Sequence, residues 1–110
     1  MKTIFVPLSK DALERFDVDE SLPGELLELK LNDVEFSSLC SSGIFEAINQ
    51  KLNKLIDEYE DEGIDNPYEL EKLLGIIEEN LAGRENPQLE KLSQLTKAAI
   101  QYKTGIFFYF

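Results

Sequence analysis

The chain has 110 residues, of which 22 are acidic and 11 are basic, and it contains one cysteine, no histidine and no tryptophan. This length fits one domain, and a hydrophobic fraction of 43% is enough to fill a core, which excludes disorder throughout. A single cysteine excludes an internal disulfide framework. The net charge of −11 argues against binding to a nucleic-acid backbone or to an anionic membrane surface.

The N-terminal segment is apolar but too short to act as a targeting sequence. Ile4–Leu8 is followed directly by charged residues, whereas a signal peptide needs an apolar stretch of roughly 7–15 residues. No run of about 20 apolar residues, the length that spans a membrane, occurs anywhere. We therefore expect a cytoplasmic protein, in which Cys40 is a lone thiol in a reducing compartment.

The first quarter of the chain predicts a strand, a short helix and a turn. Thr3–Leu8 is rich in strand-forming residues, and Ser9 can cap a helix over Lys10–Phe16. The stretch Asp17–Gly24 contains acids, Ser21 and a Pro-Gly pair, which is typical of a turn.

The next segment, 26–37, predicts a β-hairpin. Apolar residues alternate with polar ones on both sides of Asn32-Asp33, which is where the turn is expected. The apolar positions are Leu27, Leu29, Leu31, Val34 and Phe36.

From residue 42 onward the apolar period changes to three and four, which predicts amphipathic helices over 42–62, 67–82 and 87–103. The first stripe is Ile44, Ile48, Leu52, Leu55, Ile56 and Tyr59, and Gly63 is expected to end that helix. The other two helices each begin with an Asn cap followed by Pro, at Asn66-Pro67 and Asn86-Pro87. Their stripes are Leu70, Leu73, Leu74, Ile77 and Leu81, then Leu89, Leu92, Leu95, Ala99 and Tyr102.

The last five residues, Ile106–Phe110, are apolar or aromatic on both faces of a predicted strand. Such a strand needs cover on both sides, which favours a central position beside Thr3–Val6 over an edge offered to a partner. Together these elements predict one α+β domain over residues 1–110. Its small antiparallel or mixed sheet would contain the N-terminal strand, the hairpin and the C-terminal strand, packed on about three helices.

Residue types argue against catalysis and against a cofactor. Without histidine, the Ser-His-Asp and Cys-His arrangements cannot form. Cys40 precedes the expected Ser41-Ser42 helix cap, where a helix N-terminus can activate a thiol, but lone cysteines in small domains are more often buried. The glycines are scattered, so no phosphate-binding loop is indicated. Carboxylates are too numerous for any one pair to mark an acid–base site.

A calcium loop starting at Glu58 is a partial match that we reject. Acids fall at the third and fifth positions, a glycine at the sixth and Glu69 at the twelfth. The first residue should be Asp, however, Asp65 occupies the hydrophobic eighth position, and Pro67 falls inside the loop. The sequence therefore predicts no metal site.

The acidic residues are concentrated in the middle of the chain. All 22 acids and only six of the basic residues lie in 11–90, so this segment carries a net charge of −16. Five acids occupy six consecutive positions, with Asp65 just beyond, and a smaller group lies near residue 18. The two groups are Asp57, Glu58, Glu60, Asp61 and Glu62, and Asp17, Asp19 and Glu20.

The larger group is expected at the C-terminal end of the predicted helix 42–62, where carboxylates oppose the helix dipole. Each such carboxylate costs about 0.3–1 kcal/mol, and like-charged pairs four residues apart add a few tenths each. An unfavourable pattern of this kind indicates a functional site, although a solvated helix face screened by salt is the alternative interpretation. Tyr59 and Tyr68 lie beside the acids, as aromatic residues do at interfaces, although Tyr59 also belongs to the predicted core stripe.

These features predict a non-catalytic protein that binds a basic protein partner. In size, acidity and lack of catalytic residues, the chain resembles the small acidic immunity proteins of bacterial toxin–immunity systems, including those of contact-dependent growth inhibition. The resemblance implies a cytoplasmic protein that neutralises one cognate toxin, here of the basic nuclease type, by electrostatically steered occlusion. The predicted contact residues are the two acidic groups with Asp65 and Tyr68.

Two other classes of function remain open from the sequence. An acidic adaptor, regulatory subunit or nucleic-acid mimic would bind several partners or generic DNA-binding proteins. A carboxylate-dependent or metal-assisted enzyme would lose its activity when one or two acids are changed to amides.

Overall fold

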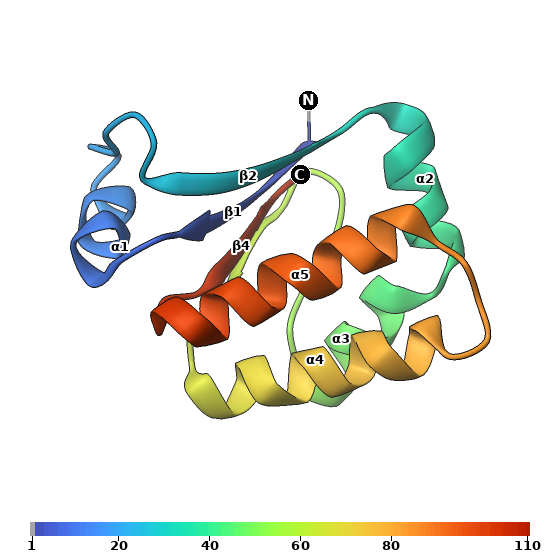
Figure 1. Cartoon of the computed structure of the whole chain (residues 1–110). Helices are drawn as coiled ribbons and strands as arrows, with labels where there is room; N and C mark the ends of the chain where they lie inside the picture. Colours follow the sequence, from blue (N-terminus) through green and yellow to red (C-terminus); the bar gives the residue numbers. More distant parts are fainter. Residues whose placement is uncertain (1) are drawn as a thin grey trace.

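Four strands form one antiparallel sheet at the centre of the molecule (Figure 1). The structure is a computed structural model that describes residues 2–110. The strands are β1 (Lys2–Pro7), β2 (Leu26–Leu31), β3 (Asp61–Ile64) and β4 (Ile106–Tyr109), in the spatial order β2-β1-β4-β3. The C-terminal strand β4 is therefore central and lies beside β1, as the sequence predicts.

Five helices accompany the sheet within residues 2–110: α1 (Lys10–Asp17), α2 (Asp33–Ser41), α3 (Ile44–Leu52), α4 (Pro67–Leu81) and α5 (Pro87–Tyr102). The predicted α+β class is confirmed. The caps at Ser9, Asn66 and Asn86 are also confirmed, because each side chain accepts hydrogen bonds from the first backbone amides of its helix.

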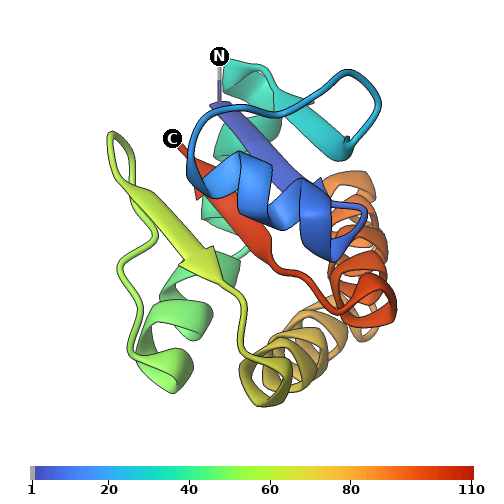
Figure 2. The ribbon, with the colours of Figure 1, turned by 90° about the vertical axis from the view of Figure 1, so that its left-hand side faces the viewer.

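The two faces of β4 explain its aromatic sequence. Phe108 is fully buried on the inner face, where its ring lies 6.3 Å from that of Phe45 in α3. On the outer face Phe107 lies 4.8 Å, between ring centroids, from Phe16 of α1. Figure 2 shows α1 crossing in front of β1 and β4, with the other helices beyond the sheet. We call the side that carries Phe5, Phe107 and Tyr109 the outer face.

The predicted hairpin over 26–37 is wrong in its second half. Asn32 and Glu35 form a reciprocal capping box, in which Glu35 N donates to the Asn32 side chain at 2.8 Å and Asn32 N donates to the Glu35 side chain at 2.9 Å. These bonds start helix α2 at the position where the turn was expected. Val34 is exposed as a consequence, and β2 pairs with β1 instead.

The predicted helix 42–62 is also wrong beyond Leu52. Helix α3 ends at Leu52, and its cap residue Asn53 adopts the left-handed conformation, which Asn tolerates better than most residues. The Asn49 side chain then holds the extended chain, accepting from Ile56 N at 2.8 Å and donating to the Ile56 carbonyl at 2.9 Å. Ile56 is buried without being helical, which is why the apolar period continues past the end of the helix.

Three residues of the predicted helix stripes are exposed instead of facing inward. Leu55 and Tyr59, assigned to the first stripe, are 60% and 87% exposed, and Tyr102, at the last position of α5, is 42% exposed. Gly63, the expected helix stop, lies within strand β3. No helix in residues 2–110 combines the length and the apolarity needed to cross a membrane.

Candidate partner-binding face

The larger acidic group lies on a loop and an edge strand, not on a helix. Residues 53–60, which we call the acidic loop, connect α3 to β3 and carry Asp57, Glu58 and Glu60. Asp61 and Glu62 are the first two residues of β3. Because none of the five is helical, the helix-dipole argument for a site does not apply to them.

Two of these acids have structural roles within the loop. The Glu62 carboxylate accepts from Leu55 N and from Gly63 N, both at 3.1 Å, and so joins the start of the acidic loop to β3. The Asp57 carboxylate accepts a hydrogen bond from Glu58 N at 2.7 Å. The backbone carbonyl of Asp57 accepts one from Glu60 N at 3.2 Å. Both acids therefore help to fix the shape of the loop.

Glu58 attaches the acidic loop to the first strand. Its carboxylate pairs with Lys2 Nζ at 3.0 Å, and the same ammonium lies 4.7 Å from the centre of the Phe36 ring. The hydrogen bond to Glu58 raises the pKa of Lys2 above its ordinary value. Lys2 is a residue that sequence reasoning missed, because nothing in the pattern places the first strand beside this loop.

Tyr59, Glu60 and Asp61 are exposed side chains at the end of the acidic loop and the start of β3. Neither Glu60 nor Asp61 forms an ion pair within residues 2–110. Tyr59 has a φ of 69°, a left-handed conformation that is a genuine outlier for a bulky residue. Tyr59 therefore combines an exposed aromatic side chain with a strained backbone, a combination that makes it a candidate contact residue.

We expect Tyr59→Asn to raise the free energy of unfolding by up to about 1 kcal/mol, because Asn adopts the left-handed conformation at lower cost than Tyr. The same change should weaken partner binding, since it removes the aromatic side chain of the loop, which is 87% exposed. Urea unfolding and partner titration measure the two effects. Tyr68→Asn, at an exposed tyrosine within α4, is the matched control and should give no gain in stability.

The smaller acidic group follows the end of α1. Asp17 is the last residue of that helix, and Asp19 is left-handed with a φ of 58°. Arg15 forms a bidentate ion pair with Glu25 and so holds the segment between α1 and β2. Glu25 Oε2 also accepts a hydrogen bond from Leu22 N at 3.0 Å. The side-chain hydrogen bond from Arg15 lowers the pKa of Glu25.

Glu25→Gln should make the free energy of unfolding depend less steeply on pH in the acidic range. The lowered pKa means that the unfolded chain takes up the Glu25 proton at a higher pH than the folded chain. The pair therefore stabilises the fold above the ordinary glutamate pKa of about 4.3, and this contribution disappears as the pH falls through the lowered value. Urea midpoints recorded across this range test the prediction. Glu28→Gln, on an exposed position of β2, is the control and should leave this pH dependence unchanged.

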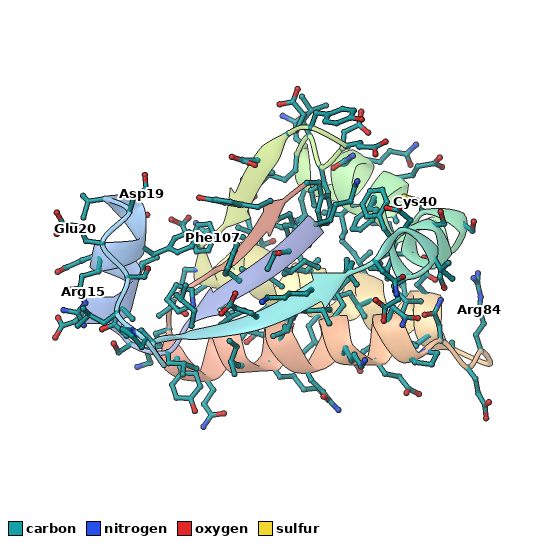
Figure 3. The ribbon with its side chains drawn as sticks, turned by 90° about the horizontal axis from the view of Figure 1, so that it is seen from above. Arg15, Asp19, Glu20, Cys40, Arg84 and Phe107 are labelled. Carbon is teal, nitrogen blue, oxygen red and sulfur yellow. The ribbon has the colours of Figure 1, made fainter. Side chains whose placement is uncertain are left out.

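The fold brings one acid of the larger group, Asp61, and two of the smaller group, Asp17 and Asp19, toward one aromatic side chain, Tyr109. Asp61 is the direct cross-strand partner of Tyr109, and the Phe16 ring of α1 lies 5.6 Å from the Tyr109 ring. Burial raises the pKa of Tyr109, and the charges of Asp61, Asp19 and Asp17 raise it further. Figure 3 shows Phe107 pointing from the sheet toward α1, with Asp19 and Glu20 in the segment that follows this helix.

Asp65 and Tyr68 lie apart from this convergence. They follow the far end of β3, where Asp65 is next to Gly105, the residue before β4, and Tyr68 lies in the first turn of α4. Lys72 stacks over the Tyr68 ring, with its ammonium 4.6 Å from the ring centre. The structure therefore groups Asp17, Asp19 and Asp61 around Tyr109 and leaves these two residues about one strand length away.

Cys40 does not precede a helix cap, contrary to the sequence interpretation. It lies in the last turn of α2, which runs through Ser41, and Gly43 is the cap of the next helix. The thiol is exposed beside a depression of about 270 Å³ between α2, α3 and the acidic loop. Partial burial and the nearby Glu58 and Asp57 carboxylates raise the pKa of Cys40, the direction that makes it less reactive.

The fold and this surface together define a small α+β protein with a partly exposed aromatic patch on its outer face, bordered by carboxylates; the patch consists of Phe5, Phe16, Phe107 and Tyr109. Within residues 2–110, no three cysteine, aspartate or glutamate side chains are grouped so that they could hold a metal ion. In comparisons with known protein families, with curated proteins and with solved structures, the chain matches none.

Proposed function

We propose that this protein is a non-catalytic inhibitor that binds a basic protein partner through its outer face and the adjoining acidic loop. The observation that carries the proposal is the position of Tyr109, which is 37% exposed and lies between carboxylates from two distant segments of the chain. Tyrosines surrounded by acids suit a surface that is both basic and partly apolar.

The class of partner follows from charge. A net charge of −16 on residues 11–90 attracts a cationic surface from a distance and raises the rate of encounter. A nuclease carries such a surface in its substrate groove, where lysine and arginine contact phosphates. We therefore propose a cytoplasmic immunity protein that occludes a cognate nuclease-type toxin.

Capture of the partner tests this proposal. The immobilised protein is incubated with extract of its source cell at low and at high salt, and the retained proteins are identified by mass spectrometry. We expect one basic protein at low salt that is depleted at high salt, and whose nuclease activity falls to zero at equimolar inhibitor. Retention of many unrelated nucleic-acid-binding proteins would instead indicate a nucleic-acid mimic, and retention unaffected by salt would contradict electrostatic steering.

A further inference from the structure

A shallow depression on the outer face lies between α1 and the edge of the aromatic patch. Its volume is about 270 Å³, and it is lined by Phe5, Phe16, Asp19, Ser21, Leu26 and Tyr109. These residues come from α1 and the segment after it and from strands β1, β2 and β4, so the depression exists only in the folded chain.

The walls of this depression are aromatic rings in mutual contact. Ring centroids lie 5.4 Å apart for Phe5 and Tyr109 and 5.6 Å apart for Phe5 and Phe16. The rings pack at tilted or edge-on angles, and Tyr109 remains partly exposed. The partly exposed ring of Tyr109 is a favourable surface for a cationic group, which is attracted to the negative face of an aromatic ring.

The border of the depression is anionic. Asp19 lines it directly, and Asp17 and Asp61 lie close enough to act on the Tyr109 phenol. Neither cation of α1 lines the depression, and Arg15 is already paired with Glu25. Lys30 shares the outer face but lies two strands from Tyr109, across β1. The depression therefore combines aromatic walls with a negative potential.

We propose that this depression receives an arginine side chain of the basic partner, an inference that rests on the function proposed above. A guanidinium is planar and weakly hydrated, so it can stack on Tyr109 or Phe5 while its N–H groups pair with the Asp19 carboxylate. A lysine ammonium is more strongly hydrated and offers no plane to stack. The depression thus prefers arginine to lysine.

A short peptide tests the site without the partner. The probe is acetyl-Gly-Arg-Gly-amide, and its control is the same peptide with citrulline, which is neutral and nearly equal in shape. We expect the arginine peptide to shift the NMR ring signals of Tyr109 and Phe5 saturably, with the lysine peptide weaker and the citrulline peptide without effect. Equal shifts from the arginine and citrulline peptides, or none from arginine, would overturn the proposal.

Asp19→Asn is the decisive variant. Asparagine tolerates the left-handed backbone of Asp19, so the fold is preserved while the charge is removed. Binding of the arginine peptide should weaken several-fold in this variant. It should be unchanged in Glu78→Gln, which removes an exposed carboxylate from α4 on the other side of the sheet. Identical affinities for the wild type and for Asp19→Asn would also overturn the proposal.

The outcomes separate this inference from the proposed function. If the partner is captured but Asp19→Asn binds it as tightly as the wild type does, the result supports the proposed function and contradicts the arginine site. If the arginine peptide binds as expected but no basic protein is captured, the result supports the arginine site and contradicts the proposed function.

Discussion

Gly63→Ala is expected to lower the free energy of unfolding by about 1–3 kcal/mol, the usual cost of overpacking. A Cβ atom at Gly63 would lie 2.6 Å from Phe107 Cδ1 and 2.7 Å from Cε1, distances that real contacts do not show. The Phe107 ring covers Gly63 on the outer face and packs against Phe16, so it cannot yield without losing that contact. Urea unfolding measures the effect.

Gly75→Ala is the matched control for this prediction. Gly75 lies within helix α4, and a Cβ atom there would meet nothing within 4 Å. Because alanine is the better helix former, this variant should gain up to about 1 kcal/mol. Equal effects from the two substitutions would show that the Phe107 ring does not constrain Gly63. The double variant Gly63→Ala/Phe107→Leu should recover part of the loss if the ring is the cause.

The double variant Glu60→Gln/Asp61→Asn should bind the partner about three- to tenfold more slowly at low ionic strength, with little change in dissociation. These two carboxylates are exposed and form no ion pair within residues 2–110, so their removal should leave stability unchanged. Stopped-flow association measures the rate. At high salt the wild type and the variant should converge, because exposed charges are then screened within a few ångströms.

Two comparisons make the association test specific. Glu71→Gln/Glu78→Gln removes the same charge from exposed positions of α4 and should slow association much less. Glu58→Gln removes the partner of Lys2 and should loosen the acidic loop, which hydrogen exchange of residues 53–60 would report. An association rate equal to that of the wild type at low salt, for Glu60→Gln/Asp61→Asn, would remove the acidic loop from the binding face.

The elements that sequence reasoning predicted correctly are those with a local cause. Helices α4 and α5 each begin with an Asn cap and a proline, so their starts are fixed by adjacent residues. The central position of β4 follows from the burial that its aromatic residues require. In each case the deciding interaction lies within a few residues or in the composition of the segment itself.

The errors have causes that lie across the chain or between competing local patterns. The sequence around Asn32 fits a hairpin turn and a helix cap equally well, and Glu35 decides for the cap. The end of α3 depends on the left-handed Asn53 and on the bonds from Asn49 to Ile56, seven residues away. A period of three and four in apolar residues cannot distinguish such an extended stretch from a continued helix.

The candidate site was predictable in part. Counting charges finds the two acidic groups, but their approach to Tyr109 depends on the register of β3 against β4 and on α1 packing over the sheet. Alternation along β4 places Phe107 and Tyr109 on one face of the strand and Phe108 on the other. This alternation is the one feature of the sequence that could have indicated that Tyr109 faces away from Phe108.

The contacts of Phe36 with Lys2 and Phe110 determine where a tag can be attached to the protein. Lys2 stacks on this ring and Phe110 packs against it at 5.0 Å between ring centroids, while Phe110 N donates to the Glu60 carbonyl. Both ends of the described chain therefore sit beside the acidic loop. An affinity tag or fluorophore fused to either terminus would crowd the surface under test. The turn at Arg84, at the opposite end of the molecule from α1 (Figure 3), is the better place to attach one.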